Sequence, residues 1–414
     1  MSDSKVFGME AEQGRWIFVL VGMLMNICLG AVYAFSVFKT PLQDLWGISA
    51  TQSSLPFMIF LAVFAVAMAL AGGIVGSWGP KRTSILGGVL VGAGWILSGF
   101  APNITWLTLF YGVIGGAGVG ILYGCPIAVA AKWFPDKKGL AVGLTVMGFG
   151  LSALIMAPIM RALIANNAVG PMKTFTYLGF AFLAILVLLS FPLRTPKDGW
   201  KPAGWSAKTT KGQTEVNLDR GEMVRTKTFY ALWGTYTIGC LAGLMAIGIS
   251  SPVGEEVAKL TPSMAAVSVS LFAIFNGIGR PIFGWLTDKL SPRNTAALSF
   301  VLILVASAAL YLWGEGNAAL YFVAFSILWL NLGGWLAIAP TATATLFGTK
   351  HYGKNYGLVF TSYGVGALLG GFLSGMIRDA TGGYLPVFVP VMILAAVGFL
   401  IALVGLKPVK PVKA

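Results

Sequence analysis

Long apolar segments alternate with short polar ones along almost the whole chain, and this pattern predicts membrane-spanning helices. Each crossing of the hydrocarbon needs about 20 apolar residues, and charged residues mark where the segments end. Twelve such segments predict an all-α membrane protein with twelve transmembrane helices. They cover residues 16–38, 52–78, 83–101, 104–131, 139–163, 174–193, 228–251, 262–285, 294–313, 318–347, 356–377 and 384–406.

Composition supports this interpretation. The chain is 57% hydrophobic and only 10% charged, with a mean hydropathy of +0.82, which excludes an ordinary soluble domain. Its 54 glycines are typical of helices that pack closely in lipid. The long apolar segments also differ from the short alternating strands of an outer-membrane barrel.

Basic residues predict the orientation. If the N-terminus is cytoplasmic, most of the 28 Lys and Arg residues fall in cytoplasmic loops, which is the usual bias. We therefore expect a multi-pass protein of the inner (plasma) membrane with both termini in the cytoplasm. The net charge of +14 is spread over many short loops, so it indicates topology and not a nucleic-acid partner.

The longest polar segment, 194–227, divides the chain nearly in half. We expect it to be a cytoplasmic linker between an N-terminal six-helix bundle, 1–193, and a C-terminal six-helix bundle, 228–414. Internal repeats favour this division. The loop around Pro80 recurs around Pro292, and the segment that begins at Lys138 recurs at Lys354 with nearly the same offset.

A Gly-rich, basic loop between the second and third spans resembles the major facilitator superfamily. Its matching residues are Gly72, Gly73, Gly79, Pro80, Lys81 and Arg82. The acidic residue usual in this loop is replaced by Gly76, whereas the second half retains Asp288. The resemblance implies two homologous bundles that rock around a central site, with an asymmetric gating contact.

The entry to the fifth span more specifically resembles the monocarboxylate porter family. Its matching residues are Phe134, Lys137, Lys138, Leu140, Ala141, Gly143 and Gly148. The Tyr-Ala-Phe sequence at 33–35 and the Gly-Ile-Leu-Tyr-Gly sequence at 120–124 resemble the same family and the related oxalate/formate antiporters. The resemblance covers the whole chain and implies transport of carboxylates.

Arg280 is the one charged residue between Leu260 and Thr287. A charge inside the membrane costs at least a few kcal/mol, so it usually faces a cavity and has a partner. All fourteen acidic residues lie outside the predicted spans. One interpretation is that the substrate carboxylate is the partner, and the resemblance implies this role because an arginine of the eighth span has it in monocarboxylate porters. The alternative is that Arg280 reaches toward the cytoplasm or binds backbone carbonyls.

Asn276 precedes Arg280 by one helical turn and is expected on the same face. Its amide suits a hydroxyl or keto oxygen of the substrate, or alternatively another helix. The animal members of the family commonly have an aspartate there. Many members also have a lysine soon after the first-span Tyr-Ala-Phe, but the next residues are Ser36, Val37 and Phe38. Both departures remove usual candidates for a proton relay.

Four aromatic residues complete the predicted substrate site. Tyr33 and Tyr123 match aromatic cavity positions of the oxalate/formate antiporters, and the resemblance implies that their hydroxyls bind a carboxylate; the alternative is ordinary packing. Phe360 matches another such position, and Tyr363 stands where that branch has a second cation, a lysine. A single cation suits one carboxylate, because a dianion would keep an uncompensated buried charge.

These residues predict a secondary transporter of short monocarboxylates such as L-lactate or pyruvate, with proton symport by alternating access. We expect the partners to be the substrate, a proton and the bilayer, with a monomer as the working unit and no cofactor or metal. Alternatives are an organic-anion antiporter of the oxalate/formate type, a drug exporter and a non-transporting carboxylate sensor. A membrane enzyme is disfavoured because the spans lack a convergent set of catalytic groups.

Overall fold

The computed structural model describes residues 5–197, 200–202, 216–348 and 350–409. A two-stranded antiparallel hairpin, β1 (Lys5–Val6) and β2 (Met9–Glu10), precedes the helices. The N-terminal half then contains α1 (Ala11–Gly14), α2 (Trp16–Leu29), η1 (Gly30–Ala34), α3 (Ser36–Trp46), α4 (Ala50–Ser98), α5 (Ile104–Leu107), η2 (Thr108–Gly115), α6 (Gly116–Trp133), α7 (Lys138–Ala165) and α8 (Gly170–Ser190). The C-terminal half contains α9 (Arg220–Val224), α10 (Lys227–Glu256), α11 (Pro262–Trp313), α12 (Ala318–Phe347), α13 (Tyr352–Val359), α14 (Thr361–Thr381), η3 (Leu385–Val387) and α15 (Phe388–Gly405).

Ten helices of the described residues are long and apolar enough to cross a membrane. One of them, α11, is bent at Ser291 into two crossing segments, and α4 supplies another crossing segment after its own bend at Gly79. The described residues therefore contain the predicted twelve spans, and the expected all-α membrane fold is confirmed.

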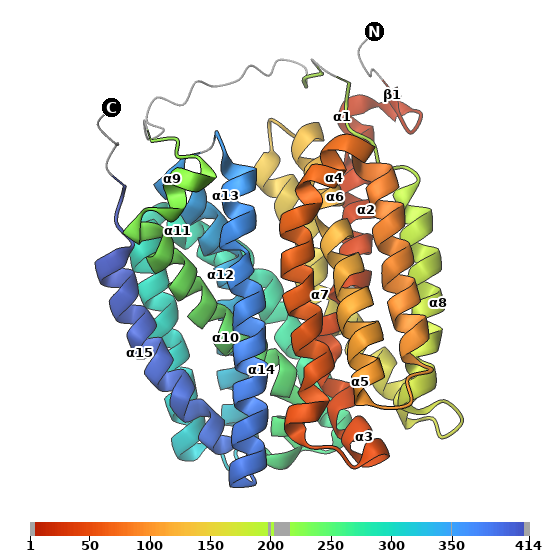
Figure 1. Cartoon of the computed structure of the whole chain (residues 1–414), viewed down its shortest axis with the longest axis vertical. Coiled ribbons are helices and arrows are strands. Elements are labelled where there is room, and N and C mark those ends of the chain that lie inside the picture. The colour runs from red at the N-terminus through yellow and green to blue at the C-terminus, as the bar shows by residue number, and fades with distance from the viewer. Residues whose placement is uncertain (1–4, 198–199, 203–215, 349, 410–414) are drawn as a thin grey trace.

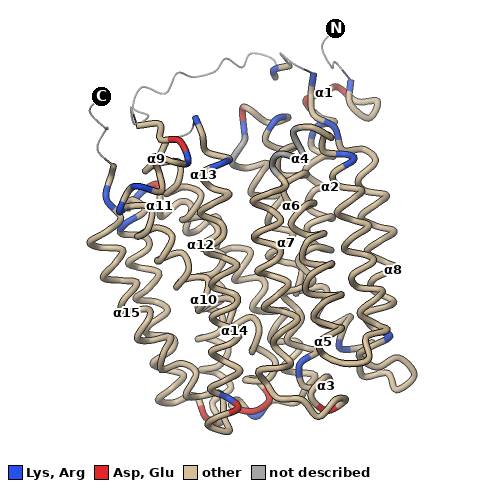
Figure 2. Tube along the Cα trace, viewed as in Figure 1, with Lys and Arg blue, Asp and Glu red and all other residues tan. Residues whose placement is uncertain are grey.

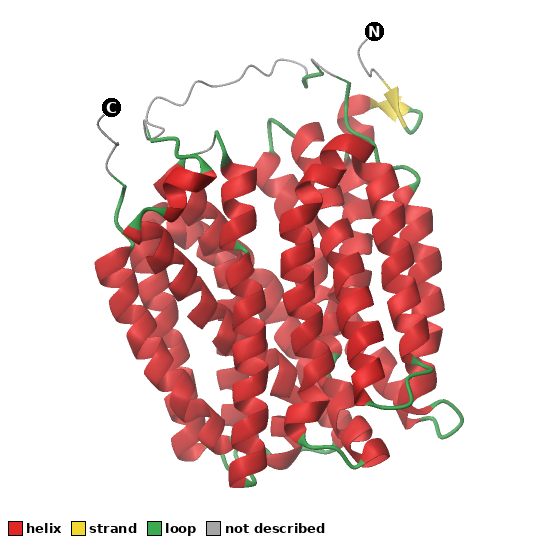
Figure 3. Ribbon diagram, viewed as in Figure 1, coloured by secondary structure: helices red, strands yellow, loops and turns green. Residues whose placement is uncertain are grey.

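The two halves stand side by side, with their helices running between two ends of the molecule (Figure 1). β1 and the C-terminal end of α15, near the two ends of the described chain, lie at one end of the molecule, which we call the terminal end; the opposite end is the far end. Helices joined by short loops fill the space between these ends (Figure 3). Across the division, α4 packs against α14 and α7 packs against α11. Charged residues are concentrated at the two ends, with many Lys and Arg at the terminal end (Figure 2).

Matching bends in the two halves support the predicted repeat. Gly79 has φ 75° and ψ 167°, and Ser291 has φ 75° and ψ 156°. Each residue directly precedes a proline, Pro80 or Pro292, at the same place in its half. This backbone conformation suits glycine, so Ser291 adopts a strained version of the same bend.

Helical structure continues beyond the predicted end of the first span. Residues 16–38 were expected to form the span, but α3 carries the helical path to Trp46. Its sequence is polar enough to be interpreted as a loop, yet Val37, Phe38 and Leu42 are buried against the core. This packing stabilises the extra turns.

The described end of the 194–227 segment contacts the C-terminal half. The Leu218 amide donates to the Phe347 carbonyl oxygen over 3.0 Å, and Asn355 Nδ2 donates to the Leu218 carbonyl oxygen over 2.9 Å. The short helix α9 follows, with Met223 buried. Residues 198–199 and 203–215 lie outside the described residues. The linker and the bundle boundaries at 193 and 228 stay predictions.

Candidate substrate site

Arg280 lies on α11 and is 8% exposed, so its guanidinium is buried as predicted from the surrounding sequence. Nη1 donates to the Val146 carbonyl oxygen of α7 over 2.7 Å. Nε and Nη2 have no hydrogen-bond partner among the described residues. Leaving buried donors unsatisfied is costly, so these two nitrogens favour an acceptor that arrives from outside the chain.

The backbone contact also corresponds to part of the alternative interpretation, in which Arg280 binds carbonyl groups. The carbonyl belongs to α7 of the other half and not to a broken turn of α11 itself. Arg280 consequently joins the two halves while it retains two free donors. These two donors are what distinguish it from a residue whose only role is to hold two helices together.

A shell of mainly aromatic side chains surrounds the guanidinium. Both halves contribute to a small shared space in which the packed side chains leave essentially no free volume. It is lined by Tyr33, Phe64, Tyr123, Phe149, Arg280, Leu336, Phe360 and Tyr363. A usual ligand pocket has a volume of roughly 300 Å³ or more. In this conformation the rings are closed around the arginine, and a substrate has to separate them.

Aromatic rings from both halves contact one another around Arg280. Phe360 stacks on Tyr363 with centroids 5.1 Å apart, and Phe64 meets both of these rings edge-on at 5.7 Å. Tyr123 meets Phe64 and Phe149 edge-on at 5.3 and 5.4 Å. These packed rings exclude water, which strengthens any charge pair formed with a carboxylate.

A hydroxyl pair crosses the same space. Tyr33 Oη and Tyr363 Oη are 2.8 Å apart, and both side chains are almost fully buried. Tyr33 belongs to η1 of the N-terminal half and Tyr363 to α14 of the C-terminal half. This hydrogen bond therefore joins the two halves across the site and has to break when the halves separate.

Asn276 is oriented differently from the other predicted site residues. Its Nδ2 donates to the Trp329 carbonyl oxygen over 3.2 Å. A carbonyl oxygen only accepts hydrogen bonds, so the nitrogen of the Asn276 amide, and not its oxygen, faces Trp329. Oδ1 faces Gly150 of α7, where an added Cβ would be 2.9 Å away. Asn276 is thus outside the ring-lined space in this conformation, whereas the other five predicted residues line it.

Lys39 is a buried cation that the sequence analysis placed in a loop. It lies on α3, is 1% exposed and donates from Nζ to Ser54 Oγ over 2.7 Å. Burial lowers the pKa of Lys39 from its ordinary value to about 7. Helix α3 continues past the predicted end of the first span at Phe38 and carries Lys39 inward, so Arg280 is not the only buried cation between the halves.

Other residues of the site gave no separate signal in the sequence. Phe64 and Phe149 line the space, but a phenylalanine in an apolar span has the same pattern whether it packs in a core or faces a substrate. Leu336 is equally undistinguished. Among the described residues, no group of three or more His, Cys, Asp or Glu side chains is placed to hold a metal ion.

The signature at the start of the fifth span has a structural role at the terminal end. Arg15 pairs with both oxygens of Asp136, at 2.6 and 2.8 Å, and donates to the Trp133 carbonyl oxygen over 3.1 Å. Its guanidinium also lies 4.4 Å from the Phe134 ring centroid. Hydrogen bonds from Arg15 lower the pKa of the Asp136 carboxyl. These contacts fix the loop that leads into α7, which carries the Val146 carbonyl.

Two side-by-side helical halves around a closed, arginine-containing site define a membrane transporter of the two-bundle class. The sequence matches the family model described as Major Facilitator Superfamily over residues 16–344 and 256–414. The chain belongs to this superfamily, as its sequence indicated.

Curated relatives include carboxylate transporters. The chain is 29% identical over 369 residues to the oxalate:formate antiporter of Oxalobacter formigenes, covering 89% of this chain and 86% of that protein. It is 28% identical over 398 residues to monocarboxylate transporter 13 of Rattus norvegicus, covering 94% and 88%.

A solved structure agrees in fold. A bacterial homologue of the human lysosomal transporter Spinster, in an inward-facing and unoccupied conformation, superposes with a TM-score of 0.71 at 17% identity. The superposition covers 96% of this chain and 99% of that chain.

Proposed function

We propose that the protein is a secondary active transporter of short monocarboxylates such as L-lactate or pyruvate, and that it works as a proton symporter by alternating access. The observation that carries this proposal is the buried guanidinium of Arg280, whose Nε and Nη2 have no partner among the described residues. A carboxylate accepts two parallel N–H bonds from such a fork. Once the surrounding rings separate, they offer an apolar surface to a short substrate tail.

The proposed proton coupling rests on which residues lie beside Arg280 on α11. Asn276 occupies the position where the animal members commonly have an aspartate, so α11 has no carboxylate beside Arg280. We infer that the proton crosses with the substrate, because a neutral acid loses less solvation energy than its anion at the apolar gate. The two halves, with boundaries near residues 193 and 228, then rock in a monomer whose termini are cytoplasmic in the inner (plasma) membrane.

Exchange of organic anions, as in an oxalate/formate antiporter, is the second candidate. Lys39 supports it, because a second buried cation near the path weakens the argument that only one carboxylate can be balanced. The similarity to the oxalate:formate antiporter of Oxalobacter formigenes supports it as well. A substrate panel that includes a dianion separates the two candidates.

Ligand-induced stabilisation of the purified protein tests the site directly. Lactate, pyruvate, acetate, oxalate and the uncharged amide of lactate are each added while thermal unfolding is followed. A ligand at ten times its Kd stabilises the folded state by about 1.4 kcal/mol. We expect this effect with monocarboxylates, and its loss in Arg280→Met. Equal stabilisation by the uncharged amide, or none by any acid, contradicts the proposed site.

A further inference from the structure

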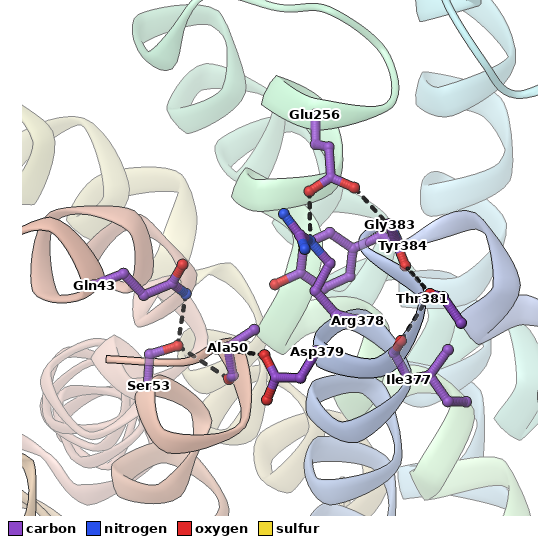
Figure 4. Close-up of polar contacts among 10 residues, drawn as sticks. All are labelled: Gln43, Ala50, Ser53, Glu256, Ile377, Arg378, Asp379, Thr381, Gly383 and Tyr384. Atoms are coloured by element: carbon purple, nitrogen blue, oxygen red, sulfur yellow. Dashed lines mark hydrogen bonds and ion pairs between the residues drawn. The ribbon is translucent and has the colours of Figure 1, made fainter. Parts of the chain in front are cut away.

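The two halves are joined at the far end by Asp379, the third residue from the end of α14. Its carboxylate accepts hydrogen bonds from the Ala50 amide over 2.9 Å and the Thr51 amide over 3.1 Å, and it also accepts from Thr51 Oγ1. Ala50 and Thr51 are the first residues of α4, in the other half. Figure 4 shows Ala50 beside Asp379. An anion at the N-terminal turn of a helix satisfies free N–H groups and interacts favourably with the helix dipole.

A tight helix contact leads from the centre to this carboxylate. On α14, Gly375 faces Thr51 so closely that an added Cβ would lie 2.5 Å from the Thr51 Cα, and Gly371 faces the Met58 side chain. Nearer the centre, an added Cβ on Gly364 would lie 2.9 Å from the Ala65 Cβ. One face of α14 therefore packs closely on α4, and it carries Gly364, Gly371, Gly375 and Asp379. Asp379 lies at the far end of this contact.

Neighbouring groups hold Asp379 in place from the C-terminal half alone. Arg378 Nε donates to Glu256 Oε2 over 2.7 Å, and the other oxygen, Oε1, accepts from the Tyr384 amide over 2.9 Å. Thr381 Oγ1 donates to the Gly383 carbonyl oxygen over 3.1 Å. This corner is visible in Figure 4 and ties the end of α14 to α10. When the halves part, the corner stays with α14, and the contacts of Asp379 with α4 and of Lys39 with Asp379 and Tyr384 have to break.

We propose that Asp379 together with Ala50 and Thr51 forms the far-end clasp, a gate contact that keeps the site closed on the side opposite the termini. The inference rests on the proposed transport function for its purpose, but the clasp is a property of the fold. Opening toward the far end requires the carboxylate to exchange three donors of α4 for water. When the halves close again, the Asp379 carboxylate regains these three hydrogen bonds at the end of the closely packed contact between α4 and α14.

Thiol labelling tests the clasp without any substrate. Phe57 of α4 is 2% exposed and faces Gly248 of α10, so separation of the halves near the far end uncovers this side of residue 57. The variant Phe57→Cys is made in a chain whose Cys28, Cys125 and Cys240 are replaced by alanine. A membrane-impermeant maleimide is then applied to the purified protein in detergent, and the labelling rate is measured.

Adding Asp379→Ala is expected to raise the labelling rate about fivefold, and Asp379→Asn about twofold, since the amide keeps one acceptor but loses the charge. Thr381→Val is the matched control, because the Thr381 hydroxyl bonds only Ile377 and Gly383 of its own half. Labelling at the parent rate in both Asp379 variants overturns the inference. If Asp379→Ala does not fold, Asp379→Asn and Thr51→Val carry the test, with the same expected direction. A carrier that binds no carboxylate would still show the labelling change, so the two proposals fail separately.

Discussion

Arg280 keeps two guanidinium nitrogens without a partner among the described residues although it is buried between the halves. This arrangement was predictable only in part. The isolated charge in an apolar sequence indicated a site, but its contact with the Val146 carbonyl depends on how α7 packs against α11. Similarly, a backbone oxygen of Trp329 decides which way Asn276 points, and no side-chain pattern reports a backbone oxygen.

The planar fork of Arg280 is expected to be essential. In Arg280→Lys a single ammonium cannot make the parallel pair of bonds, so uptake of a monocarboxylate should fall at least about tenfold while expression is retained. Arg293→Lys, an exposed change on the same helix, is the control. Uptake kinetics in proteoliposomes measure both variants, and unchanged KM and rate in Arg280→Lys would rule out the assigned role.

Charge selectivity is predicted to depend on Tyr363. Tyr363→Lys places a second cation in the ring-lined space and should raise the preference for oxalate over lactate by about tenfold, which corresponds to ~1.4 kcal/mol. Tyr363→Phe removes the hydroxyl bonded to Tyr33 without adding charge, and is expected to leave the preference unchanged. Competition of each acid against labelled lactate measures the ratio. The charge argument fails if the lysine variant gains nothing for the dianion.

Lys39 predicts a particular pH dependence of stability. Because burial depresses its pKa to about 7, the unfolded chain binds more protons than the folded one from pH 7 up to the ordinary lysine range. The Lys39 contribution therefore becomes less unfavourable as pH rises through that window. The facing groups are Ser54, Asp379 and Tyr384.

Lys39→Met keeps the apolar stem and removes the buried charge. It should stabilise the protein at pH 7 by on the order of 2–4 kcal/mol, and the gain should shrink toward pH 10. Thermal unfolding of the variant and the parent from pH 6 to 10 tests the sign. A variant that is less stable at pH 7, or a gain that grows with pH, contradicts the assigned burial effect.

At the scale of the elements, the predicted spans were mostly found because apolar length is a strong signal. The connections were less predictable. Where charged loops were expected after the second and eighth spans, two helices instead join directly at a bend, at Gly79 and at Ser291. One residue with positive φ is enough to turn the chain there. Helix α3 was missed because tertiary packing, and not its local sequence, makes it helical.

Exchanging the two bend residues tests this symmetry. Ser291→Gly should stabilise the protein by about 1 kcal/mol because it relieves backbone strain. Gly79→Ser should destabilise it by about the same amount, and an added Cβ there meets no atom within 4 Å, so the cost is that of the backbone alone. Thermal unfolding of both variants measures the effects. The same sign in both would show that the two bends are not equivalent.

At the scale of the whole molecule, the halves meet along α4 with α14 and α7 with α11, and the site lies between them. The internal repeat predicted two six-helix bundles. It did not predict that the halves would be fastened by Asp379 at the far end, because that contact joins residues 328 positions apart through backbone amides. Alternating access requires such contacts to exchange while Arg280 stays at the centre.

The most direct test of the account is uptake of labelled lactate, pyruvate, acetate and oxalate into proteoliposomes, with and without an imposed pH gradient. The account predicts electroneutral monocarboxylate uptake that is stimulated by an inward proton gradient, needs no sodium and is lost in Arg280→Lys. Asn276→Asp should retain activity with a shifted pH dependence. Uptake driven by membrane potential alone, or a strict need for sodium or a counter-transported anion, would contradict the symport mechanism, and binding without any uptake would identify a sensor instead.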